Sequence, residues 1–291
     1  MSDCGTYAIS VIAFIGSVFS PWYRWSGRRN PENHVCINVA TYGPGGRFTM
    51  TDRGQRALRQ SETTFVVGPS HLQWSGKTLL VDVDEWAAPP IPGRVQGQIR
   101  LYPDALSSDE LPLTPDGCHI WRPFAPSARI EVDLNRGVKW AGHGYFDANF
   151  GTRALEQDFS YWTWARFPTD DGAVAFYDAD RLDGSTLSAA VHFDRNGTVT
   201  PIALPDRRPM ARSLWMVRRD TRGDANSRPT QTKAMLDAPF YCRSVVRTQL
   251  GGRWHDGVHE ALDLRRFRQP WLKPMIAMRV PRRPGWQFAD P

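Results

Sequence analysis

The sequence has few cysteines, and no two of them are close together. They are Cys4, Cys36, Cys118 and Cys242. Because no C-x-x-C pair is present, neither a zinc-finger spacing nor a disulfide framework is indicated, and we expect four reduced thiols. The apolar run from Tyr7 to Phe19 is too short to span a bilayer, and no basic residue precedes it. These absences predict a cytoplasmic chain with neither a secretory signal nor a membrane-spanning helix.

The motifs that mark common cofactors and nucleophiles are also missing. No Gly-x-Gly-x-x-Gly follows a predicted strand, and there is no Walker loop and no Gly-x-Ser-x-Gly elbow. We therefore predict no organic cofactor. The formal net charge is +6, but no RNP, zinc-finger or helix-turn-helix pattern accompanies it, so nucleic acid is not an expected partner. The excess charge predicts a solvated basic surface that can also touch anionic lipid headgroups.

One segment superficially resembles a metal-binding motif. A zincin helix carries two histidines one turn apart and a glutamate base. Here His255 and His259 have that spacing, but Asp256 replaces the glutamate and Gly257 weakens a helix. No third ligand is suggested by the sequence, so we predict no metal site.

The 291 residues include 12 tryptophans and 23 prolines, and short apolar runs alternate with turn signals. Asp-Gly and Asn-Gly pairs separate several of these runs, which is typical of β-hairpins. The predicted strands are 35–42, 65–67, 79–83, 95–102, 128–134, 162–167, 173–177, 188–193, 198–202, 214–218 and 241–250. This rhythm predicts an all-β protein of antiparallel sandwiches or barrels.

Only two segments have helical character, 147–158 and 255–267, and neither is long. The polar stretch 218–233 predicts a long surface loop. A chain of this length built from short strands most naturally forms two β domains, so we predict an N-terminal domain of residues 1–151 and a C-terminal domain of residues 152–291.

Two short motifs carry the clearest chemical information. His119 and Trp121 are two residues apart, as are Tyr145 and Asp147, so each pair shares a face if its segment is extended. The apolar and aromatic neighbours of Asp147 disfavour its anion, which predicts a carboxyl that can hold a proton to donate. The structural alternatives are a helix-capping Asp147 and a core Trp121 beside a histidine bonded to the backbone. Asp133 and Asp158 are rival carboxyls in more polar stretches.

The segment from Trp162 to Arg166 repeats the same spacing. Trp162, Trp164 and Arg166 would share one side of a strand, where the two indoles can line an apolar channel. An inter-domain core strand is the alternative interpretation.

With these motifs in view, the chain resembles the acyclic carotenoid 1,2-hydratases (hydroxyneurosporene synthases) of purple photosynthetic bacteria. The similarity runs through nearly the whole length. Its most specific pieces are 14–23, the His119–Trp121 pair, 144–151 and 258–264. The resemblance implies two packed lipocalin-like β-barrels with few short helices, and activity without an organic cofactor or metal.

The resemblance also implies a reaction and its partners. Water is added to the terminal C1–C2 double bond of an acyclic carotenoid such as neurosporene or lycopene, which gives a tertiary alcohol. The implied catalytic residues are Asp147 as proton donor, Trp121 and Tyr145 facing the cation, and His119 orienting or recharging Asp147 or taking a proton from water. Trp162 and Trp164 are the expected substrate-binding residues.

Two alternatives remain open at this stage: a non-catalytic pigment carrier, and a pericyclase or isomerase of the same superfamily. A lipid-soluble substrate also changes how the aromatic and basic segment from Phe267 to Trp286 is interpreted. Such mixtures occur at membrane interfaces. We therefore expect the protein to bind peripherally to the inner or intracytoplasmic membrane.

Overall fold

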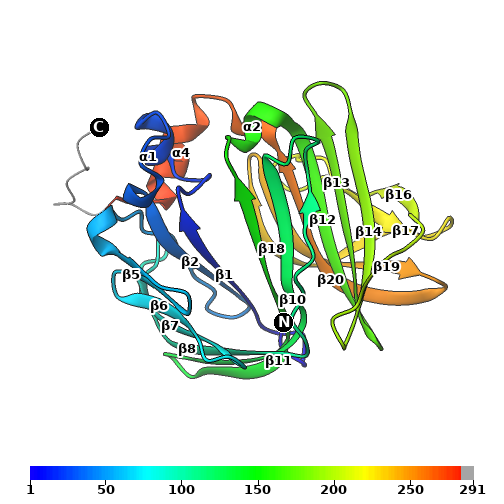
Figure 1. Cartoon of the computed structure of the whole chain (residues 1–291), viewed down its shortest axis with the longest axis horizontal. Coiled ribbons are helices and arrows are strands. Elements are labelled where there is room, and N and C mark those ends of the chain that lie inside the picture. The colour runs from blue at the N-terminus through cyan, green and yellow to red at the C-terminus, as the bar shows by residue number, and fades with distance from the viewer. Residues whose placement is uncertain (283–291) are drawn as a thin grey trace. The chain divides into compact units, whose positions relative to one another are not determined.

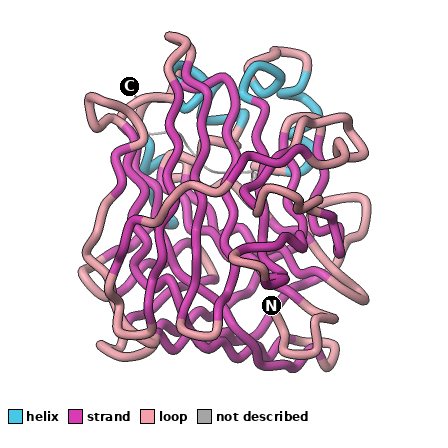
Figure 2. Tube along the Cα trace, turned by 90° about the vertical axis from the view of Figure 1, so that its right-hand side faces the viewer, coloured by secondary structure: helices cyan, strands magenta, loops and turns pink. Residues whose placement is uncertain are grey.

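The computed structural model describes residues 1–282. Antiparallel strands dominate it, and the helices are short (Figures 1 and 2). The all-β class predicted from the sequence is therefore confirmed. None of the helices among the described residues is long and apolar enough to cross a membrane.

The described chain divides into two compact units whose segments interleave along the sequence. The first comprises Met1–Pro103, Ala128–Tyr145 and the chain from Trp271 onward, and the second comprises Asp104–Ser127 and Phe146–Pro270. One junction, between residues 145 and 146, lies close to the expected boundary at residue 151. The expected division into two β domains, residues 1–151 and 152–291, remains a prediction.

The first unit contains two antiparallel sheets. The smaller joins β1 (Ala8–Ile15), β2 (Val35–Tyr42) and β3 (Phe48–Thr49). The larger joins the C-terminal part of β10 (His119–Leu134) and the N-terminal part of β11 (Val138–Gly151) to five further strands. These are β4 (Leu58–Gln60), β5 (Thr64–Val67), β6 (Ser70–Trp74), β7 (Leu79–Trp86) and β8 (Arg94–Pro103).

Short helices close one side of the first unit. They are α1 (Pro21–Trp25), α4 (Leu272–Arg279) and the 3₁₀ turns η1 (Pro31–Asn33) and η2 (Gln55–Ala57). The α1 and α4 helices lie together, and the Trp22 indole donates to the Val280 carbonyl over 2.7 Å. Cys36 and Met50 pack against Val280 in the apolar core beneath them. This contact ties the C-terminal helix to the N-terminal strands.

The second unit is built on a seven-stranded antiparallel sheet in the order β15-β14-β13-β12-β20-β19-β18. Its strands are β12 (Phe159–Thr169), β13 (Gly172–Arg181), β14 (Thr186–Asp194), β15 (Val199–Pro201), β18 (Thr230–Ala238), β19 (Tyr241–Leu250) and β20 (Arg253–Asp263). The remaining elements of this unit are β9 (Leu111–Pro112), β16 (Asp206–Pro209), β17 (Asp220–Gly223), α2 (Leu155–Asp158) and α3 (Leu264–Phe267).

The two faces of this sheet bury different sets of side chains. Phe167 and Phe176 pack with alanines and valine on one face, and Tyr161, Val217, Cys242 and Ala261 form a second cluster there. The opposite face carries the alternate residues, and Trp121 of β10 packs against two of its rings. The apolar clusters and the rings that contact Trp121 therefore lie on opposite faces of the sheet.

Four expectations about secondary structure are wrong. The expected helix over 255–267 is the strand β20 for most of its length, because β20 pairs with β12 on one side and β19 on the other. Only α3 at its end is helical. The expected helix over 147–158 is reduced to α2, since β11 stays extended through residue 151.

The other two errors concern residues 214–233. Residues 214–218 are a turn and coil, whereas β17 and the first residues of β18 lie within the expected loop 218–233. Charged side chains there are buried in ion pairs: Arg222 bonds Asp178, and the side chain of Asp178 is only 2% exposed. Composition alone therefore did not indicate the strand.

Candidate functional site

The two sequence motifs meet through one hydrogen bond. The indole Nε1 of Trp121 donates to Oδ2 of Asp147 over 2.7 Å. Trp121 lies on β10 and is 3% exposed, whereas Asp147 lies on β11 and is partly buried. A helix-capping role for Asp147 does not fit this extended strand.

The surroundings of Asp147 raise the pKa of its carboxyl. Burial disfavours its anion and raises the pKa of the carboxyl to about 6. The Trp121 bond opposes that rise, the negative charge of Glu260 adds to it, and the positive charge of Arg243 opposes it. At neutral pH a fraction of roughly 10% of such a group holds its proton. This is the state required of a general acid.

Aromatic rings pack against Trp121, the hydrogen-bond partner of Asp147. The ring centroid of Trp121 lies 5.8 Å from that of Tyr177 and 6.2 Å from that of Phe193. Trp162 meets Tyr177 edge-on at 5.7 Å. Burial, together with the charges of Asp147 and Glu260, raises the pKa of Tyr177 well above its ordinary value, so its phenol stays neutral. Aromatic rings therefore pack on Trp121 and on its neighbour Tyr177.

Trp162 and Trp164 share the face on which these rings lie. Trp164 pairs in register with Tyr177 of β13 and with Glu260 of β20. Trp164 is buried, and Trp162 is half-buried with an indole nitrogen that has no hydrogen-bond partner among the described residues. Both indoles therefore belong to the face that receives Trp121. Their role in binding substrate remains a prediction.

His119 contacts a different carboxylate from the one we expected. Its Nε2 lies 2.7 Å from Oδ2 of Asp158, and its ring packs on Phe159 with centroids 5.2 Å apart. Burial opposes the Asp158 anion, but hydrogen bonds from Arg153 and His119 lower the pKa of that carboxyl. His119 is 1% exposed. His119 and Asp158 thus form a hydrogen-bonded pair at the start of β10, which we call the clamp.

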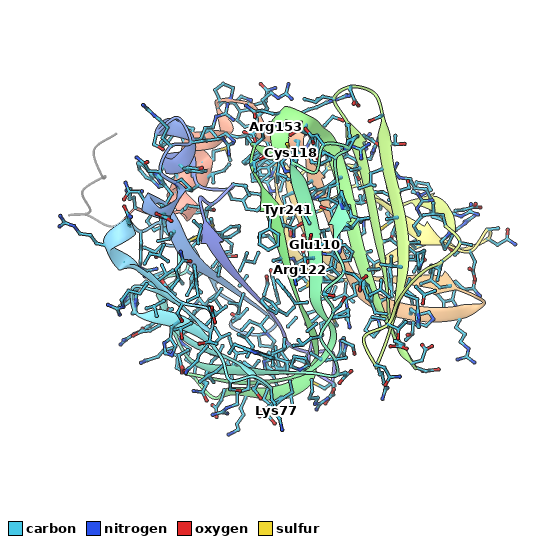
Figure 3. The ribbon with its side chains drawn as sticks, in the orientation of Figure 1. Lys77, Glu110, Cys118, Arg122, Arg153 and Tyr241 are labelled. Carbon is cyan, nitrogen blue, oxygen red and sulfur yellow. The ribbon has the colours of Figure 1, made fainter. Side chains whose placement is uncertain are left out.

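Arg153 extends this clamp toward the surface. Its guanidinium bonds both Asp158 and Asp116, and Cys118 donates its thiol to Asp116. Figure 3 places Cys118 and Arg153 beside each other near α2. The network holds the start of β10 to the α2 segment, which fixes the position of the residues that follow His119.

Tyr145 stands two residues before Asp147 on β11 and is partly buried. Alternate side chains of a strand point to the same side, so Tyr145 and Asp147 share a side of β11. Tyr145 is the last residue of its segment in the first unit, and Asp147 belongs to the second. The predicted role of Tyr145 beside a cation remains a prediction.

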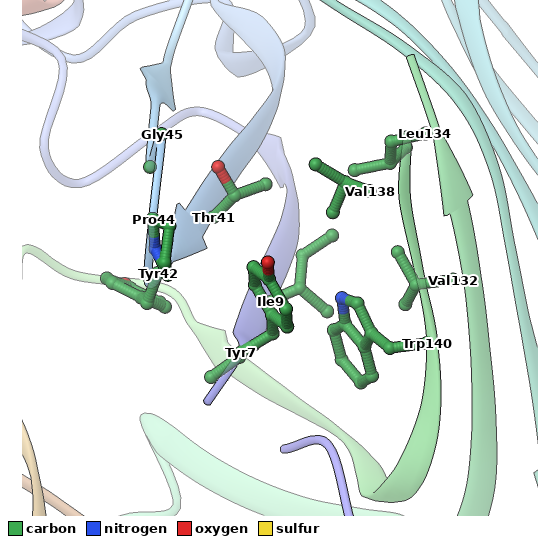
Figure 4. Close-up of a pocket in the computed structure, with 12 residues that line it drawn as sticks. Tyr7, Ile9, Thr41, Tyr42, Pro44, Gly45, Val132, Leu134, Val138 and Trp140 are labelled. Carbon is green, nitrogen blue, oxygen red and sulfur yellow. The ribbon is translucent and has the colours of Figure 1, made fainter. Parts of the chain in front are cut away.

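A small pocket occurs in the first unit. Its lining includes Tyr7, Ile9 and Trp140 (Figure 4). None of the predicted site residues contributes to it. We therefore assign the chemistry to the Trp121–Asp147 pair and its rings, where titratable groups and electron-rich faces coincide.

The histidines of the apparent metal motif lie on a strand. His255 approaches the Pro168 carbonyl, and Nε2 of the fully buried His259 lies 2.8 Å from the Asp220 carbonyl. Within residues 1–282, no group of three or more His, Cys, Asp or Glu side chains is arranged to hold a metal ion.

Comparisons with known proteins decide the family. The family model described as carotenoid hydratase CrtC matches residues 11–289. The chain belongs to the carotenoid hydratase family. Its relatives include the acyclic carotenoid 1,2-hydratase of Cereibacter sphaeroides, 60% identical over 279 residues that cover 96% of this chain and 100% of the relative. The acyclic carotenoid 1,2-hydratase of Rhodobacter capsulatus is 59% identical over 281 residues, with 96% and 100% covered.

A solved structure shares the fold of this carotenoid hydratase family member. The crystal structure of CghA aligns with a TM-score of 0.50 at 13% sequence identity, covering 90% of this chain and 86% of that one. At that identity the likeness concerns the fold alone. The resemblance stated from the motifs is confirmed by the family match and the relatives.

Three residues that the sequence reasoning did not single out lie near the candidate site: Tyr177, Arg243 and Glu260. Their signal is the strand register, which aligns Tyr177, Trp164, Glu260 and Arg243 across four neighbouring strands. Glu260 stands within the family-like segment 258–264, which was expected to be helical. Because this segment was expected to be helical, the position of Glu260 beside Trp164 could not be foreseen.

Proposed function

We propose that this protein adds water to the terminal C1–C2 double bond of acyclic carotenoids such as neurosporene and lycopene, giving the tertiary 1-hydroxy carotenoid. Membership of the carotenoid hydratase family and the names of its relatives support the reaction class. The observation that carries the mechanism is Asp147, a carboxyl with a raised pKa that is bonded to Trp121 within an aromatic enclosure.

The proposed reaction begins with proton transfer. Neutral Asp147 donates its proton to C2, the alkene carbon that bears hydrogen, and the π electrons form the new C–H bond. The positive charge then lies on C1, which carries two methyl groups and is the more stabilised tertiary position. A water oxygen attacks C1 and loses a proton. No electron transfer is involved, so the residues need supply only proton transfer and charge stabilisation.

The same hydrogen bond serves both protonation states. Before transfer, burial keeps a fraction of Asp147 neutral. After transfer, the Trp121 N–H stabilises the new carboxylate by its hydrogen bond. We assign the cation to the ring faces of Trp121 and Tyr145, since electron-rich rings attract positive charge.

We assign Trp162 and Trp164 to the apolar tail of the substrate. They lie on the same sheet face as Tyr177 and supply large aromatic surfaces. The contact of His119 with Asp158 supports an indirect role for His119 in this proposal, namely holding β10 in place. Return of a proton from His119 to Asp147 is the alternative role, and the two roles predict different variant behaviour.

Incubation with lycopene or neurosporene in H₂¹⁸O tests the function. We expect a product with one ¹⁸O per hydrated end. The Asp147→Asn variant should bind the pigment, seen as an absorption shift, but form alcohol about 10²-fold to 10⁴-fold more slowly, the range for losing a general acid. Folded Asp147→Asn with wild-type activity would overturn the assignment.

The same experiment separates the two alternative functions. A pigment carrier would shift the absorption of the carotenoid and yield no ¹⁸O product. A pericyclase or isomerase would return a product of unchanged mass. Only hydration adds the mass of water.

We also propose that the protein binds peripherally to anionic membranes, on the cytoplasmic side of the inner or intracytoplasmic membrane. In the second unit, the adjacent residues Leu214, Trp215 and Met216 are 88%, 47% and 56% exposed. Asp237 bonds the Leu214 amide, and Arg266 bonds the Trp215 carbonyl. These bonds hold the apolar tip outward, as expected of a surface that meets lipid.

The segment 267–286 is partly buried and partly exposed. Phe267, Leu272 and Lys273 are buried, whereas Trp271, Met275 and Met278 are 62%, 41% and 69% exposed. Trp286 lies outside the described residues. The proposed membrane contact therefore rests mainly on the exposed residues 214–216 and on Arg266 beside them.

Co-sedimentation with anionic vesicles at low salt tests this attachment. Trp215→Ser should weaken binding about 10-fold to 100-fold, because burial of a large apolar side chain contributes roughly 1.5 to 3 kcal/mol. Trp254→Ser is the matched control: Trp254 is 58% exposed, at the opposite end of β19 and β20 from the Asp237 and Arg266 contacts. Equal binding of wild type and Trp215→Ser, or no binding by wild type, would contradict the proposal.

A further inference from the structure

The segment 258–264 contains a carboxylate that the proposed hydration steps leave unused. Successive residues of β20 point to opposite faces. His259 is fully buried and approaches the Asp220 carbonyl. Glu260 points to the other face, beside Trp164 in register. This strand therefore delivers Glu260 to the face that receives Trp121.

Glu260 is held as an ion pair by Arg243 of the neighbouring strand. Both Nε and Nη2 of Arg243 lie 2.7 Å from Oε1 of Glu260. The side chains are 10% and 17% exposed, so water screens them little. These two charge-assisted hydrogen bonds fix the position of the Glu260 carboxylate.

The register places this pair close to the proposed acid. Tyr177, Trp164, Glu260 and Arg243 follow one another across β13, β12, β20 and β19. Neighbouring strands are about 4.8 Å apart, so Glu260 lies about 10 Å across the sheet from Tyr177. The Tyr177 ring in turn contacts Trp121, which bonds Asp147. Arg243 and Glu260 also act electrostatically on Asp147 with opposite signs.

We propose that Glu260 is the second catalytic carboxylate, the base that takes a proton from water as its oxygen attacks the cation. This inference rests on the proposed hydration. The water O–H bond breaks as the C1–O bond forms, and the proton moves to a Glu260 oxygen. After the alcohol leaves, that proton passes through water to the Asp147 carboxylate, which restores both groups.

The two carboxyls differ in their partners, which suits different roles. Burial raises the pKa of Asp147, which can donate a proton, whereas Glu260 is held by Arg243 in an ion pair and presents a carboxylate that can accept one. Arg243 is a positioning residue here, because it acts through Glu260.

Deuterium exchange separates the two half-reactions. In D₂O, Asp147 delivers deuterium to C2, and its carboxylate can then remove the original hydrogen and regenerate a labelled alkene. We expect Glu260→Gln to form alcohol about 10²-fold to 10⁴-fold more slowly while still placing deuterium in recovered lycopene. Asp147→Asn should lose both the label and the alcohol.

Asp256→Asn is the matched control, since Arg247 and Asp256 form an exposed cross-strand pair on the same two strands. It should keep both activities. Because Glu260→Gln leaves Arg243 buried without this carboxylate, the double variant Glu260→Gln/Arg243→Gln is measured alongside, and should fold and show the same separation of label from alcohol.

Wild-type alcohol formation by either Glu260 variant would overturn the role of Glu260 and leave that of Asp147 intact. Loss of label together with alcohol in a folded Glu260 variant would overturn it as well, because Glu260 would then act before protonation. Wild-type activity of Asp147→Asn would instead overturn the proposed function.

Discussion

The indole N–H of Trp121 donates to the carboxyl of Asp147 over 2.7 Å, joining β10 to β11. Phe146 and Ala148 flank Asp147 in the sequence, and Trp121 itself is almost fully buried. Burial raises the free energy of the Asp147 anion, and the indole lowers it again. The net effect of burial and the indole bond is a pKa of about 6 for this carboxyl. A carboxyl with that pKa can both donate a proton and take one back near neutral pH.

The rate of hydration should depend on pH through Asp147. Only its protonated form donates, so the rate should be highest below pH 6 and fall about tenfold per pH unit above it. The measurement is kcat for lycopene in detergent between pH 5 and pH 9, with folding monitored at each pH. A profile that is flat from pH 6 to pH 9 would contradict the assignment of Asp147 as the acid.

The same shift predicts a pH-dependent gain in stability for Asp147→Asn. The folded protein binds this proton with a pKa of about 6, against the ordinary 3.8, so folding stability falls as pH rises between these values. The wild type then carries a penalty of about 1 to 3 kcal/mol above pH 6, which an amide avoids. Urea unfolding should show the Asp147→Asn variant more stable than wild type at pH 8 and equally stable near pH 4. A gain of the same size at both pH values would indicate another cause.

Trp121 should show separate contributions from its N–H and its ring. Trp121→Phe keeps an aromatic face but removes the donor, so the pKa of Asp147 should rise and the pH profile should move upward. Trp121→Ala also removes the ring contacts to Tyr177 and Phe193 and should cost about 3 to 5 kcal/mol of stability. Pigment binding and pH profiles of both variants distinguish these effects. Identical profiles for Trp121→Phe and wild type would exclude an electrostatic role.

The neighbourhood of this site could be predicted from the sequence because it depends on local spacing. His119 with Trp121, and Tyr145 with Asp147, are alternate residues of strands, as their two-residue spacing indicated. The apolar surroundings of Asp147 likewise predicted the direction of its pKa shift. Strand positions such as 35–42 and 241–250 followed from β-branched runs bounded by turns.

Partners that come from distant strands could not be predicted in this way. Glu260 reaches the site only because β20 pairs with β12 and β19, and that pairing involves residues far apart in sequence. The charges of the polar 255–267 segment have helical spacing, which favoured a helix. Pairing with β12 and β19 outweighs that local preference. The contact of His119 with Asp158 could not be predicted for the same reason, since α2 brings Asp158 back to β10.

The two proposed roles of His119 make opposite predictions. If His119 is a structural clamp, His119→Gln and Asp158→Asn should each destabilise the fold, and a double-mutant cycle should give a coupling energy of about 1 to 3 kcal/mol. Folded variants would then keep the wild-type pH profile. If His119 recharges Asp147, His119→Gln should lower kcat and change the profile, whereas Asp158→Asn should lower kcat less. Urea unfolding and pH–rate profiles of the four proteins decide between them.

A buried ion pair in the first unit should be essential to its stability and independent of catalysis. Arg53 donates two hydrogen bonds to Glu85, over 2.9 and 2.7 Å, and Ser70 donates a third over 2.9 Å. Glu85 is fully buried, and burial raises the pKa of its carboxyl while the Arg53 bonds oppose that rise. Arg53→Met should therefore cost about 3 to 5 kcal/mol, because it leaves a buried charge unpaired.

The pH dependence of that loss follows from the sign of the shift. Without Arg53 the pKa of Glu85 rises further, so the folded variant gains stability when the carboxyl is protonated. The loss should be larger at pH 8 than at pH 5. Arg53→Met/Glu85→Gln removes the unpaired charge and should recover part of the loss at pH 8. A loss that is independent of pH, or no recovery in the double variant, would show that packing rather than the buried charge controls stability here.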